Sequence, residues 1–528
     1  DDPTFVEVRR WITEDKVGGV TMSLGSPIEV AAKVNVLQRM ADVPLLVASD
    51  LEPGLGRLVG GVQVPSLLPA GSATLLTTNM AIGAGGREED AYRVGRITGR
   101  EARATGINVV FAPTSDVNNN PANPVINTRS FGEDPKQVAR LAAAFARGVQ
   151  EAGALATAKH FPGHGDTDTD SHLALPTVAS DRARLDSIEL VPFRAAIEAG
   201  VGAIMTAHIA LPALGEPETP ATLVPAVVTG LLRDTLGFTG MVFTDAMTME
   251  GIGKGYQVEQ SSVLAVKAGA DVLLKPSDVR RAIDAVVQAV ERGEIAPERI
   301  ERSARRTLEM KARLGLDRAR LVDLDALRRV VGAPEHWAAA RDVAARAVTL
   351  LRDSASLVPA APAGKVAVVT YAPELEIVAG RAFAAELRSL AKGVSVARIS
   401  PHSGRAELDS IAAAIAGAER IVVTTHVRTI EGEGRFAIPP HVAQWVDELA
   451  RRTGKVVVVA NGNPYVIRQF PSVGSYMVTY GIDPSLERAA AQALAGAAPI
   501  TGRAPISLPG FFARGDGIQR SATRSAAQ

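Results

Sequence analysis

The sequence predicts an α/β protein in which an N-terminal (β/α)8 TIM-type barrel is followed by a three-layer α/β/α sandwich domain. Three observations support this prediction: the length of the chain, the alternation of apolar strands with helical patterns, and a change of that alternation in the second half. At 528 residues the chain is too long for one ordinary domain. Its 46% hydrophobic and 22% charged residues are typical of a globular protein with a large core.

Strand and helix patterns alternate from about Val17 to Leu314. Stretches such as Ser187–Ala199 and Pro225–Leu236 carry apolar residues at helical spacing, and each is followed by a glycine where a helix would end. Such a long alternation predicts a parallel sheet, and its length favours a closed barrel. The expected strands are Val20–Leu24, Leu45–Ser49, Ile107–Phe111, Leu155–Ala158, Ala203–Thr206, Met241–Thr244 and Asp271–Leu274.

The second half has shorter, alanine-rich helices between its strands. Leu316–Asp353 has no strand pattern and is expected to form a helical connector. Five strands in the part that follows suit an open sandwich better than a second barrel. They are Val366–Thr370, Val394–Ile399, Ile421–Thr425, Val456–Ala460 and Tyr476–Tyr480. We therefore expect a barrel domain over 1–318, a helical linker over 319–353, a sandwich over 354–515 and a tail over 516–528 that is disordered at its end.

Ionisable residues follow several of the expected barrel strands. Because the carboxyl ends of barrel strands converge at one mouth, such residues are expected to lie close together. The alternative is that they are ordinary capping and turn residues. They are Asp50, Lys159, His160, His208, Asp245 and Lys275.

The densest polar feature is the run from Lys159 to His172, K-H-F-P-G-H-G-D-T-D-T-D-S-H, which holds three of the chain's eight histidines. Its proline and glycines predict a loop over the barrel mouth. Imidazoles and carboxylates together could bind a metal ion. They could instead perform acid–base catalysis, because Asp170 and His172 lie two residues apart and can face the same way in an extended segment. A solvated polar loop is the third interpretation.

This run, with Leu175-Pro176 after it, resembles the signature of the β-N-acetylglucosaminidase branch of glycoside hydrolase family 3. The resemblance covers nearly the whole chain. It includes Asp50 in A-S-D-L-E-P-G, Arg129 in N-T-R-S-F-G and Asp245 at the end of G-F-T-G-M-V-F-T-D. In the second half, N-P-Y and I-S-L-P are similar to the C-terminal domain of that family.

The resemblance implies a retaining exo-β-N-acetylglucosaminidase that releases terminal β-linked N-acetylglucosamine from cell-wall or chitin-type oligosaccharides. Asp245 would form the covalent glycosyl intermediate, and His172, oriented by Asp170, would act as acid/base in place of the usual glutamate. Retaining enzymes hold these two groups about 5 Å apart. No metal and no cofactor are expected. The residues expected to bind the sugar are Asp50, Arg129, Lys159, His160, His208 and Met249.

Two alternatives are kept. Glu431 and Glu433 lie in E-G-E-G-R, which is similar to a loop that supplies a glutamate acid/base in the β-glucosidase branch. Such a role would make the protein a β-glucosidase or β-xylosidase, whereas on the first interpretation this loop is a surface turn. A protein of another class, a catalytically silent sugar-binding protein, would be expected to lack Asp245 or His172, and both are present. The aglycone, and whether water or phosphate is the acceptor, are not indicated by the sequence.

Composition restricts the partners. A formal net charge of +0 gives no basic surface for nucleic acid, and no apolar run is long enough to span a membrane. The expected partner is a carbohydrate substrate, and the sequence does not indicate an oligomeric state. The start at Asp1 without methionine, together with the second domain, favours an extracytoplasmic (periplasmic or secreted) bacterial enzyme, with a cytoplasmic one as the alternative.

Overall fold

The structure, a computed structural model, describes residues 2–23, 25–58, 62–63, 73–214, 216–253, 255–359, 364–428 and 437–523. The chain divides into two compact units, and each unit is assembled from separate segments. The first unit contains 1–74, 88–126 and 135–336, and the second contains 75–87, 127–134 and 337–528. The sequence-based boundary at 318 is therefore corrected, because three-dimensional contacts assign two early segments to the second unit and extend the first unit to His336.

The first unit contains, among its described residues, a six-stranded parallel sheet in the order β1-β2-β5-β6-β7-β10. Neighbouring strands follow one another in chain order, so the sheet winds in one direction. The expected strand Asp271–Leu274 is reduced to a parallel bridge between Phe243 and Val272. The Asp271 carboxylate accepts the Val242 N–H at 3.0 Å, in place of a longer backbone ladder. The strands are β1 (Gly19–Thr21), β2 (Leu46–Ser49), β5 (Val109–Val110), β6 (Leu155–Phe161), β7 (Ala203–Thr206) and β10 (Met241–Phe243).

Helices connect these strands, and their ends follow local sequence signals. Ser26 and Asp278 each cap a helix by accepting a backbone N–H, and the glycines after the two predicted helices, Gly200 and Gly237, adopt positive φ angles of 78° and 69°. Pro225–Leu236, expected as an α-helix, forms a π-helix, η5 (Ala226–Thr235). The helices are α1 (Pro3–Thr13), α2 (Pro27–Met40), α4 (Glu88–Ala104), α5 (Pro135–Glu151), α6 (Arg182–Ser187), α7 (Val191–Glu198), α8 (Glu250–Gly253), α9 (Val258–Ala268), α10 (Val279–Glu291), α11 (Pro297–Arg313) and α12 (Leu324–Val330).

Two short antiparallel pairs and two 3-10 turns complete the described elements of the first unit. The strand β3 (Arg57–Leu58) pairs with β4 (Val62–Gln63), and β8 (Ala210–Leu211) pairs with β9 (Glu216–Pro220). The turns are η3 (Pro212–Leu214) and η4 (Ala221–Leu223).

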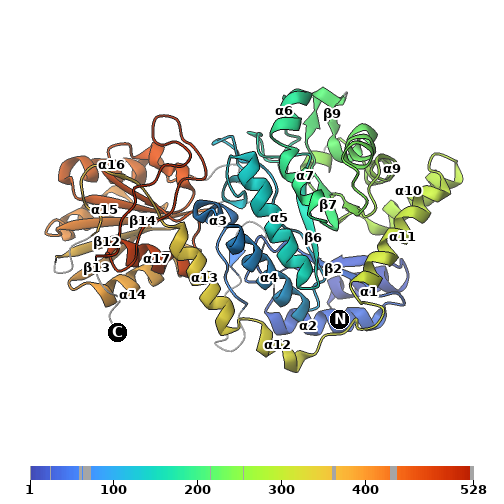
Figure 1. Cartoon of the computed structure of the whole chain (residues 1–528), viewed down its shortest axis with the longest axis horizontal. Coiled ribbons are helices and arrows are strands. Elements are labelled where there is room, and N and C mark those ends of the chain that lie inside the picture. The colour runs from blue at the N-terminus through green and yellow to red at the C-terminus, as the bar shows by residue number, and fades with distance from the viewer. Residues whose placement is uncertain are drawn as a thin grey trace. The chain divides into compact units, whose positions relative to one another are not determined.

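The helices α4 and α5 lie side by side (Figure 1) and touch backbone to backbone. A Cβ added at Gly95 would lie 2.2 Å from the Phe145 carbonyl oxygen, and one added at Gly148 would lie 2.2 Å from the Tyr92 carbonyl oxygen. Only glycine allows this approach, so these positions decide how closely the two helices pack.

The second unit contains a six-stranded sheet, among its described residues, in the order β11-β16-β15-β14-β12-β13. All pairs are parallel except the edge pair of β11 with β16. All five strands expected for this half are present, but Leu316–Asp353 also contains one, β11, which was expected to lack strands. This strand has a bulge between Leu350 and Arg352, which removes the alternation that would have predicted it. The strands are β11 (Thr349–Asp353), β12 (Val366–Tyr371), β13 (Val394–Ile399), β14 (Arg420–Val427), β15 (Val456–Gly462) and β16 (Ser475–Val478).

Helices cover both faces of this sheet, with α14 and α17 together on one side and α15 and α16 on the other (Figure 1). The core includes Met80, Ala81 and Ala84 of the early helix α3. The helices of this unit are α3 (Asn79–Gly85), η2 (Asn127–Arg129), α14 (Arg381–Leu390), α15 (Arg405–Ala414), α16 (Pro440–Thr453), η6 (Pro464–Gln469) and α17 (Pro484–Leu494), and α13 (Pro334–Ala347) crosses from the first unit into the second.

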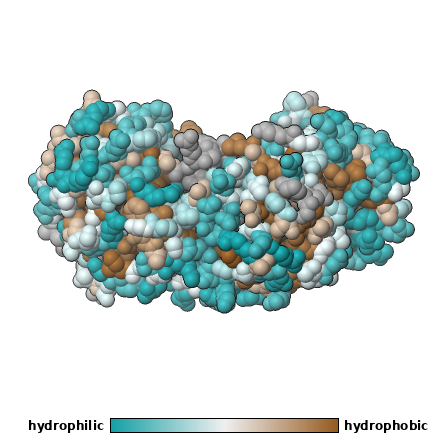
Figure 2. Space-filling model, turned by 90° about the horizontal axis from the view of Figure 1, so that it is seen from above, coloured by the Kyte–Doolittle hydropathy of each residue, from teal (hydrophilic) through white to brown (hydrophobic). Residues whose placement is uncertain are grey.

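The end of the described chain belongs to the second unit. The Ile518 N–H donates to the Leu350 carbonyl at 2.8 Å, and the Thr523 N–H donates to the Gly496 carbonyl at 2.9 Å. Residues 516–523 of the expected tail are therefore ordered by backbone hydrogen bonds, and 524–528 lie outside the described residues. The surface mixes hydrophilic residues with separate hydrophobic patches on the face shown in Figure 2. Within the described part of the chain, no helix combines the length and the apolar character needed to cross a bilayer.

Candidate active site

Asp245 follows β10 at the carboxyl end of the first sheet. Its Oδ1 accepts the Ala246 N–H at 2.7 Å. Desolvation by burial would raise its pKa, but the charges of His160, His208 and Lys159, together with that hydrogen bond, outweigh it and hold the pKa below its usual value. Asp245 is therefore a carboxylate at neutral pH, as a nucleophile must be.

Lys159 is a buried cation at the carboxyl end of β6. Its Nζ donates to Asp50 Oδ1 at 2.7 Å and also pairs with the Glu52 carboxylate. The Lys159 side chain is 2% exposed, whereas that of Asp50 is 24% exposed, so Asp50 is the member of this group that faces the solvent. Glu52 was not singled out from the sequence, although it stands two residues after Asp50 in the loop that follows β2.

His160 is oriented by an aspartate that sequence reasoning missed. Its Nδ1 lies 2.8 Å from Asp116 Oδ2, and its backbone N–H donates to the same carboxylate. Burial acts to raise the pKa of Asp116, but His160 and the His164 N–H overcome this and lower it. Asp116 follows β5 at the same end of the sheet, so the polar residues after strands were the signal that could have found it.

His172 and Asp170 form a hydrogen-bonded pair. The His172 Nδ1 lies 2.8 Å from Asp170 Oδ1, and the His172 N–H donates to the same oxygen at 2.8 Å. The carboxylate is 1% exposed and the imidazole 27% exposed. A buried carboxylate at Nδ1 selects the tautomer and stabilises the imidazolium, which suits the ring for proton transfer.

His208 is fully buried beside the Asp245 loop. Its Nε2 lies 3.1 Å from the Ala246 carbonyl and its Nδ1 lies 2.9 Å from Thr222 Oγ1. Desolvation lowers its pKa more than the nearby Asp245 raises it, so the ring is neutral. Both ring nitrogens thus contact protein atoms, and Nε2 contacts the Asp245 loop itself, whereas direct contact of His208 with the sugar stays a prediction. Met249 is 8% exposed, and its N–H donates to the same Ala246 carbonyl at 3.0 Å.

The loop that carries His172 is joined directly to the segment that follows Asp245. The Gly251 N–H, six residues beyond Asp245, donates to the Ser171 carbonyl at 3.0 Å. His172 and His160 both lie close enough to His208 for their charges to affect its pKa. The first unit therefore brings together most of the predicted site residues: Asp50, Lys159, His160, Asp170, His172, His208, Asp245 and Met249.

Three further predicted residues belong to other parts of the chain. Arg129 ends η2 in the second unit, where its carbonyl accepts the Asn79 Nδ2–H at 2.7 Å, and its sugar-binding role stays a prediction. Glu431 and Glu433 lie outside the described residues.

The described histidines of the loop are engaged by protein partners rather than arranged as metal ligands. His164 lies 2.8 Å from Thr167 Oγ1 through Nδ1 and 2.9 Å from Ser171 Oγ through Nε2. Among the residues that the structure describes, no group of three or more histidine, aspartate or glutamate side chains could hold a metal ion.

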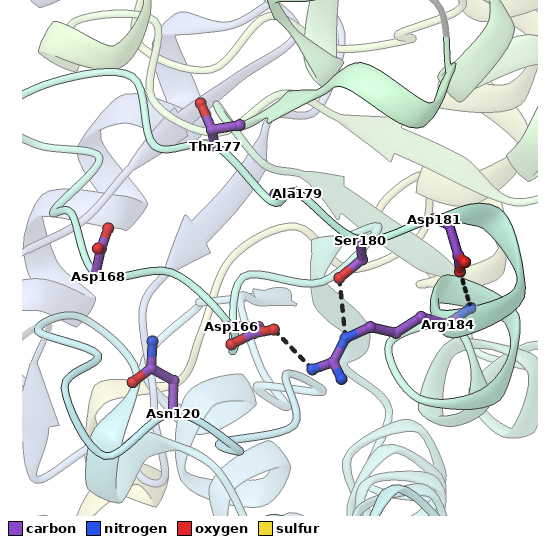
Figure 3. A pocket seen from close by; sticks show the side chains of 8 residues that line it. All are labelled: Asn120, Asp166, Asp168, Thr177, Ala179, Ser180, Asp181 and Arg184. Carbon is purple, nitrogen blue, oxygen red and sulfur yellow. Dashed lines mark hydrogen bonds and ion pairs between the residues drawn. The ribbon is translucent and has the colours of Figure 1, made fainter.

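A polar hollow of about 420 Å³ lies along the outer part of the same loop (Figure 3). Arg184 crosses it, donating to Asp166 at 2.7 Å and to Ser180 at 3.0 Å, while Asp181 caps α6 by accepting the Arg184 N–H. Asp245 is not among the residues that line this hollow. Its lining residues are Asn120, Asp166, Asp168, Thr177, Ala179, Ser180, Asp181 and Arg184.

A retaining glycoside hydrolase needs a carboxylate nucleophile and a nearby proton donor, and Asp245 and the His172–Asp170 pair could supply these two groups at the carboxyl end of this parallel sheet. Residues 4–310 match the model of the glycosyl hydrolase family 3 N-terminal domain. The chain therefore belongs to glycosyl hydrolase family 3, which confirms the resemblance drawn from the sequence.

Relatives and solved structures agree with this family. A β-N-acetylglucosaminidase/β-glucosidase from Cellulomonas fimi is 31% identical over 93% of this chain and 88% of its own length. β-Hexosaminidase A from Pseudoalteromonas piscicida is 34% identical over 66% of this chain and 62% of its own. The structure of a family 3 β-N-acetylglucosaminidase from Paenibacillus sp. str. FPU-7 matches with a TM-score of 0.84 and 36% identity, covering 95% of both chains.

Proposed function

We propose that this glycoside hydrolase is a retaining exo-β-N-acetylglucosaminidase acting on cell-wall or chitin-type oligosaccharides. The observation that carries the proposal is the Asp170–His172 pair on a loop hydrogen-bonded to the loop of Asp245. The relatives from Cellulomonas fimi and Paenibacillus, both named as β-N-acetylglucosaminidases, support the substrate class.

In the proposed mechanism, Asp245 attacks the anomeric carbon while His172 donates its Nε2 proton to the departing glycosidic oxygen. The glycosidic bond breaks, a glycosyl–Asp245 ester forms and His172 becomes neutral. His172 then takes a proton from water, whose oxygen attacks the anomeric carbon and releases Asp245 as a carboxylate. Asp170 stabilises the imidazolium at the start and at the end of this cycle.

The sugar would be held by the polar groups around Asp245. Asp50 presents its second carboxylate oxygen, and Lys159 and His160 lie at the end of the neighbouring strand β6. Charged partners of this kind bind hydroxyl groups through strong, directional hydrogen bonds. Arg129 and Met249 are proposed to complete this sugar-binding set.

We also propose that the first unit is a complete (β/α)8 barrel and that the protein works outside the cytoplasm. Chain-order neighbours in the sheet support a singly wound barrel, since a doubly wound sheet reverses its strand order at a switch point. The bridge from Phe243 to Val272 extends the same order by one further position.

A panel of nitrophenyl β-glycosides, assayed with and without phosphate, tests the proposal. We expect the N-acetylglucosaminide to be cleaved at least about tenfold more efficiently than the glucoside, which corresponds to about 1.4 kcal/mol in the transition state. If a glucoside or xyloside is cleaved more efficiently than the N-acetylglucosaminide, the second candidate is favoured, in which Glu431 or Glu433 supplies the acid/base. The Cellulomonas fimi relative, whose name includes both activities, is the reason to keep that candidate. A rate that rises with phosphate would identify phosphate as the acceptor in place of water.

A further inference from the structure

Ser171 stands between the two residues of the proposed acid/base pair, and it is held from two sides. Its carbonyl accepts the Gly251 N–H at 3.0 Å, and its hydroxyl lies 2.9 Å from His164 Nε2. Gly251 belongs to α8, the short helix that directly follows the Asp245 loop, whereas His164 lies in the first half of the loop that carries Asp170 and His172. Ser171 is therefore where the positions of Asp170 and His172 are set relative to Asp245.

His164 is itself rigidly held. Its side chain is buried, and its N–H donates to the Asp116 carboxylate at 2.7 Å. Its carbonyl accepts both the Asn123 amide at 2.9 Å and the Thr167 hydroxyl at 3.1 Å. Because the Thr167 proton points to that carbonyl, the ring Nδ1–H donates to Thr167 Oγ1, and Nε2 is left to accept the Ser171 hydroxyl proton.

The Gly251 side of this arrangement has no spare room. A Cβ at Gly251 would lie 3.0 Å from the Ser171 carbonyl oxygen and 3.2 Å from His208 Cβ. The backbone of α8, which follows the Asp245 loop, thus lies directly against Ser171, so a shift of Ser171 would move His172 relative to Asp245.

We propose that His164, Ser171 and Gly251 form a clamp that fixes the distance between His172 and Asp245, with His164 and Ser171 as positioning residues. The proposal rests on the proposed function, because it assumes that His172 is the acid/base. Loss of the clamp leaves the groups chemically intact but misplaced. A misplaced general acid slows the departure of poor leaving groups far more than that of good ones.

The test uses the full chain with the variants Ser171→Ala and His164→Gln. Catalytic efficiency is measured on aryl β-N-acetylglucosaminides whose leaving groups span a wide range of pKa. For substrates with the poorest leaving groups, we expect the catalytic efficiency to fall about ten- to a hundredfold. For a dinitrophenyl substrate, it should fall less than about threefold. If His164→Gln does not fold, Ser171→Ala, which removes only a hydroxyl, decides the question.

Two matched controls separate positioning from general damage. Thr169→Ala removes a hydroxyl from the same loop that donates to Asp168 Oδ1 at 3.1 Å and not to the clamp. His336→Gln removes another buried imidazole of the first unit, which pairs with Glu101 at 2.9 Å. We expect both controls to leave the leaving-group dependence unchanged. The clamp would be wrong if its variants lost catalytic efficiency equally on all substrates. It would also be wrong if their leaving-group dependence matched that of the controls.

His172→Ala is measured in the same series. If it shows the steep dependence and the clamp variants do not, the clamp is wrong and the proposed acid/base stands. If His172→Ala shows no such dependence, the proposed function fails and the clamp fails with it.

Discussion

At the scale of single residues, the site is defined by how buried charges compensate one another. Desolvation opposes ionisation of both Asp245 and Asp116, yet neighbouring histidines lower both pKa values, and Lys159 lowers that of Asp245 further. Glu189 is the contrasting case. It is buried beneath the loop, and desolvation raises its pKa more than Arg184 lowers it.

Replacement of the proposed nucleophile tests the role of Asp245. Asp245→Asn should abolish turnover with the fold retained, because an amide cannot form the glycosyl ester. The measurement is steady-state hydrolysis together with a circular dichroism melt. A fluorosugar adduct of the wild-type protein should map to Asp245, and an adduct on another residue would refute the assignment.

Replacement of the proposed acid/base pair tests the roles of His172 and Asp170. His172→Ala should lose about 10²- to 10⁴-fold on natural glycosides and far less on activated aryl glycosides, and Asp170→Ala should lose less. Added azide should restore activity to the His172→Ala variant, because this anion can attack the glycosyl intermediate without a general base. Glu431→Ala and Glu433→Ala should change little. A near-normal histidine variant beside an inactive glutamate variant would move the acid/base to the second unit.

Glu189→Gln should stabilise the protein by about 1 kcal/mol at neutral pH, because it removes a buried charge. The folded pKa of Glu189 is raised above its usual 4.5, so the native state binds a proton more readily than the unfolded state. The penalty of the wild-type carboxylate therefore grows as the pH rises above 4.5 through the raised folded pKa. Melting curves should show that the variant has a higher melting temperature than the wild type at pH 8, and that this difference shrinks toward pH 5. An equal difference at both pH values would contradict this explanation.

At the scale of elements, helix packing and strand ends position the site. The carboxyl ends of β2, β5, β6 and β10 carry its residues, and the close packing of α4 and α5 supports the sheet from outside. That packing depends on glycines, because any side chain at Gly95 or Gly148 would meet a carbonyl oxygen.

Gly95→Ala should therefore lower the free energy of unfolding by about 1–3 kcal/mol, although alanine is the better helix former. The matched control is Gly230→Ala in η5, where an added Cβ would have its nearest neighbour, the Pro225 oxygen, at 3.9 Å. Urea unfolding should show no loss for this control. A Gly95→Ala protein as stable as the wild type would mean that the helices can separate without cost.

At the scale of the whole molecule, the two units are interleaved in sequence. The second unit takes α3 and η2 from between segments of the first, and its core includes apolar residues of α3. The end of the described chain pairs with β11 through Ile518, and Arg520 lies 3.2 Å from the Asp353 carboxylate.

Truncation tests how far the chain contributes to the second unit. A chain ending at residue 523 should be as stable as the full one. A chain ending at 515 should lose about 2–4 kcal/mol, because it loses the backbone hydrogen bonds of Ile518, Arg520 and Thr523, each worth about 1 kcal/mol. Thermal melts of both would decide this, and equal melting temperatures would show that these residues are dispensable.

The sequence by itself determined the family and most of the strands and helices, and it was enough to predict a set of site residues. Asp245, Lys159 and His160 follow apolar strands, and strand periodicity is local enough to be recognised from the chain alone. The pair of Asp170 and His172 was recognisable because its members are two residues apart.

Only the tertiary structure decided what depends on contacts between distant segments. It revealed Asp116 beneath His160, the neutral His208 behind the Asp245 loop, and the clamp on Ser171. It also decided the assignment of α3 and η2 to the second unit and the strand β11, whose bulge hides its alternation. These features arise from burial and from hydrogen bonds across long separations in the chain, and no local pattern of residue types encodes which distant partner will be met.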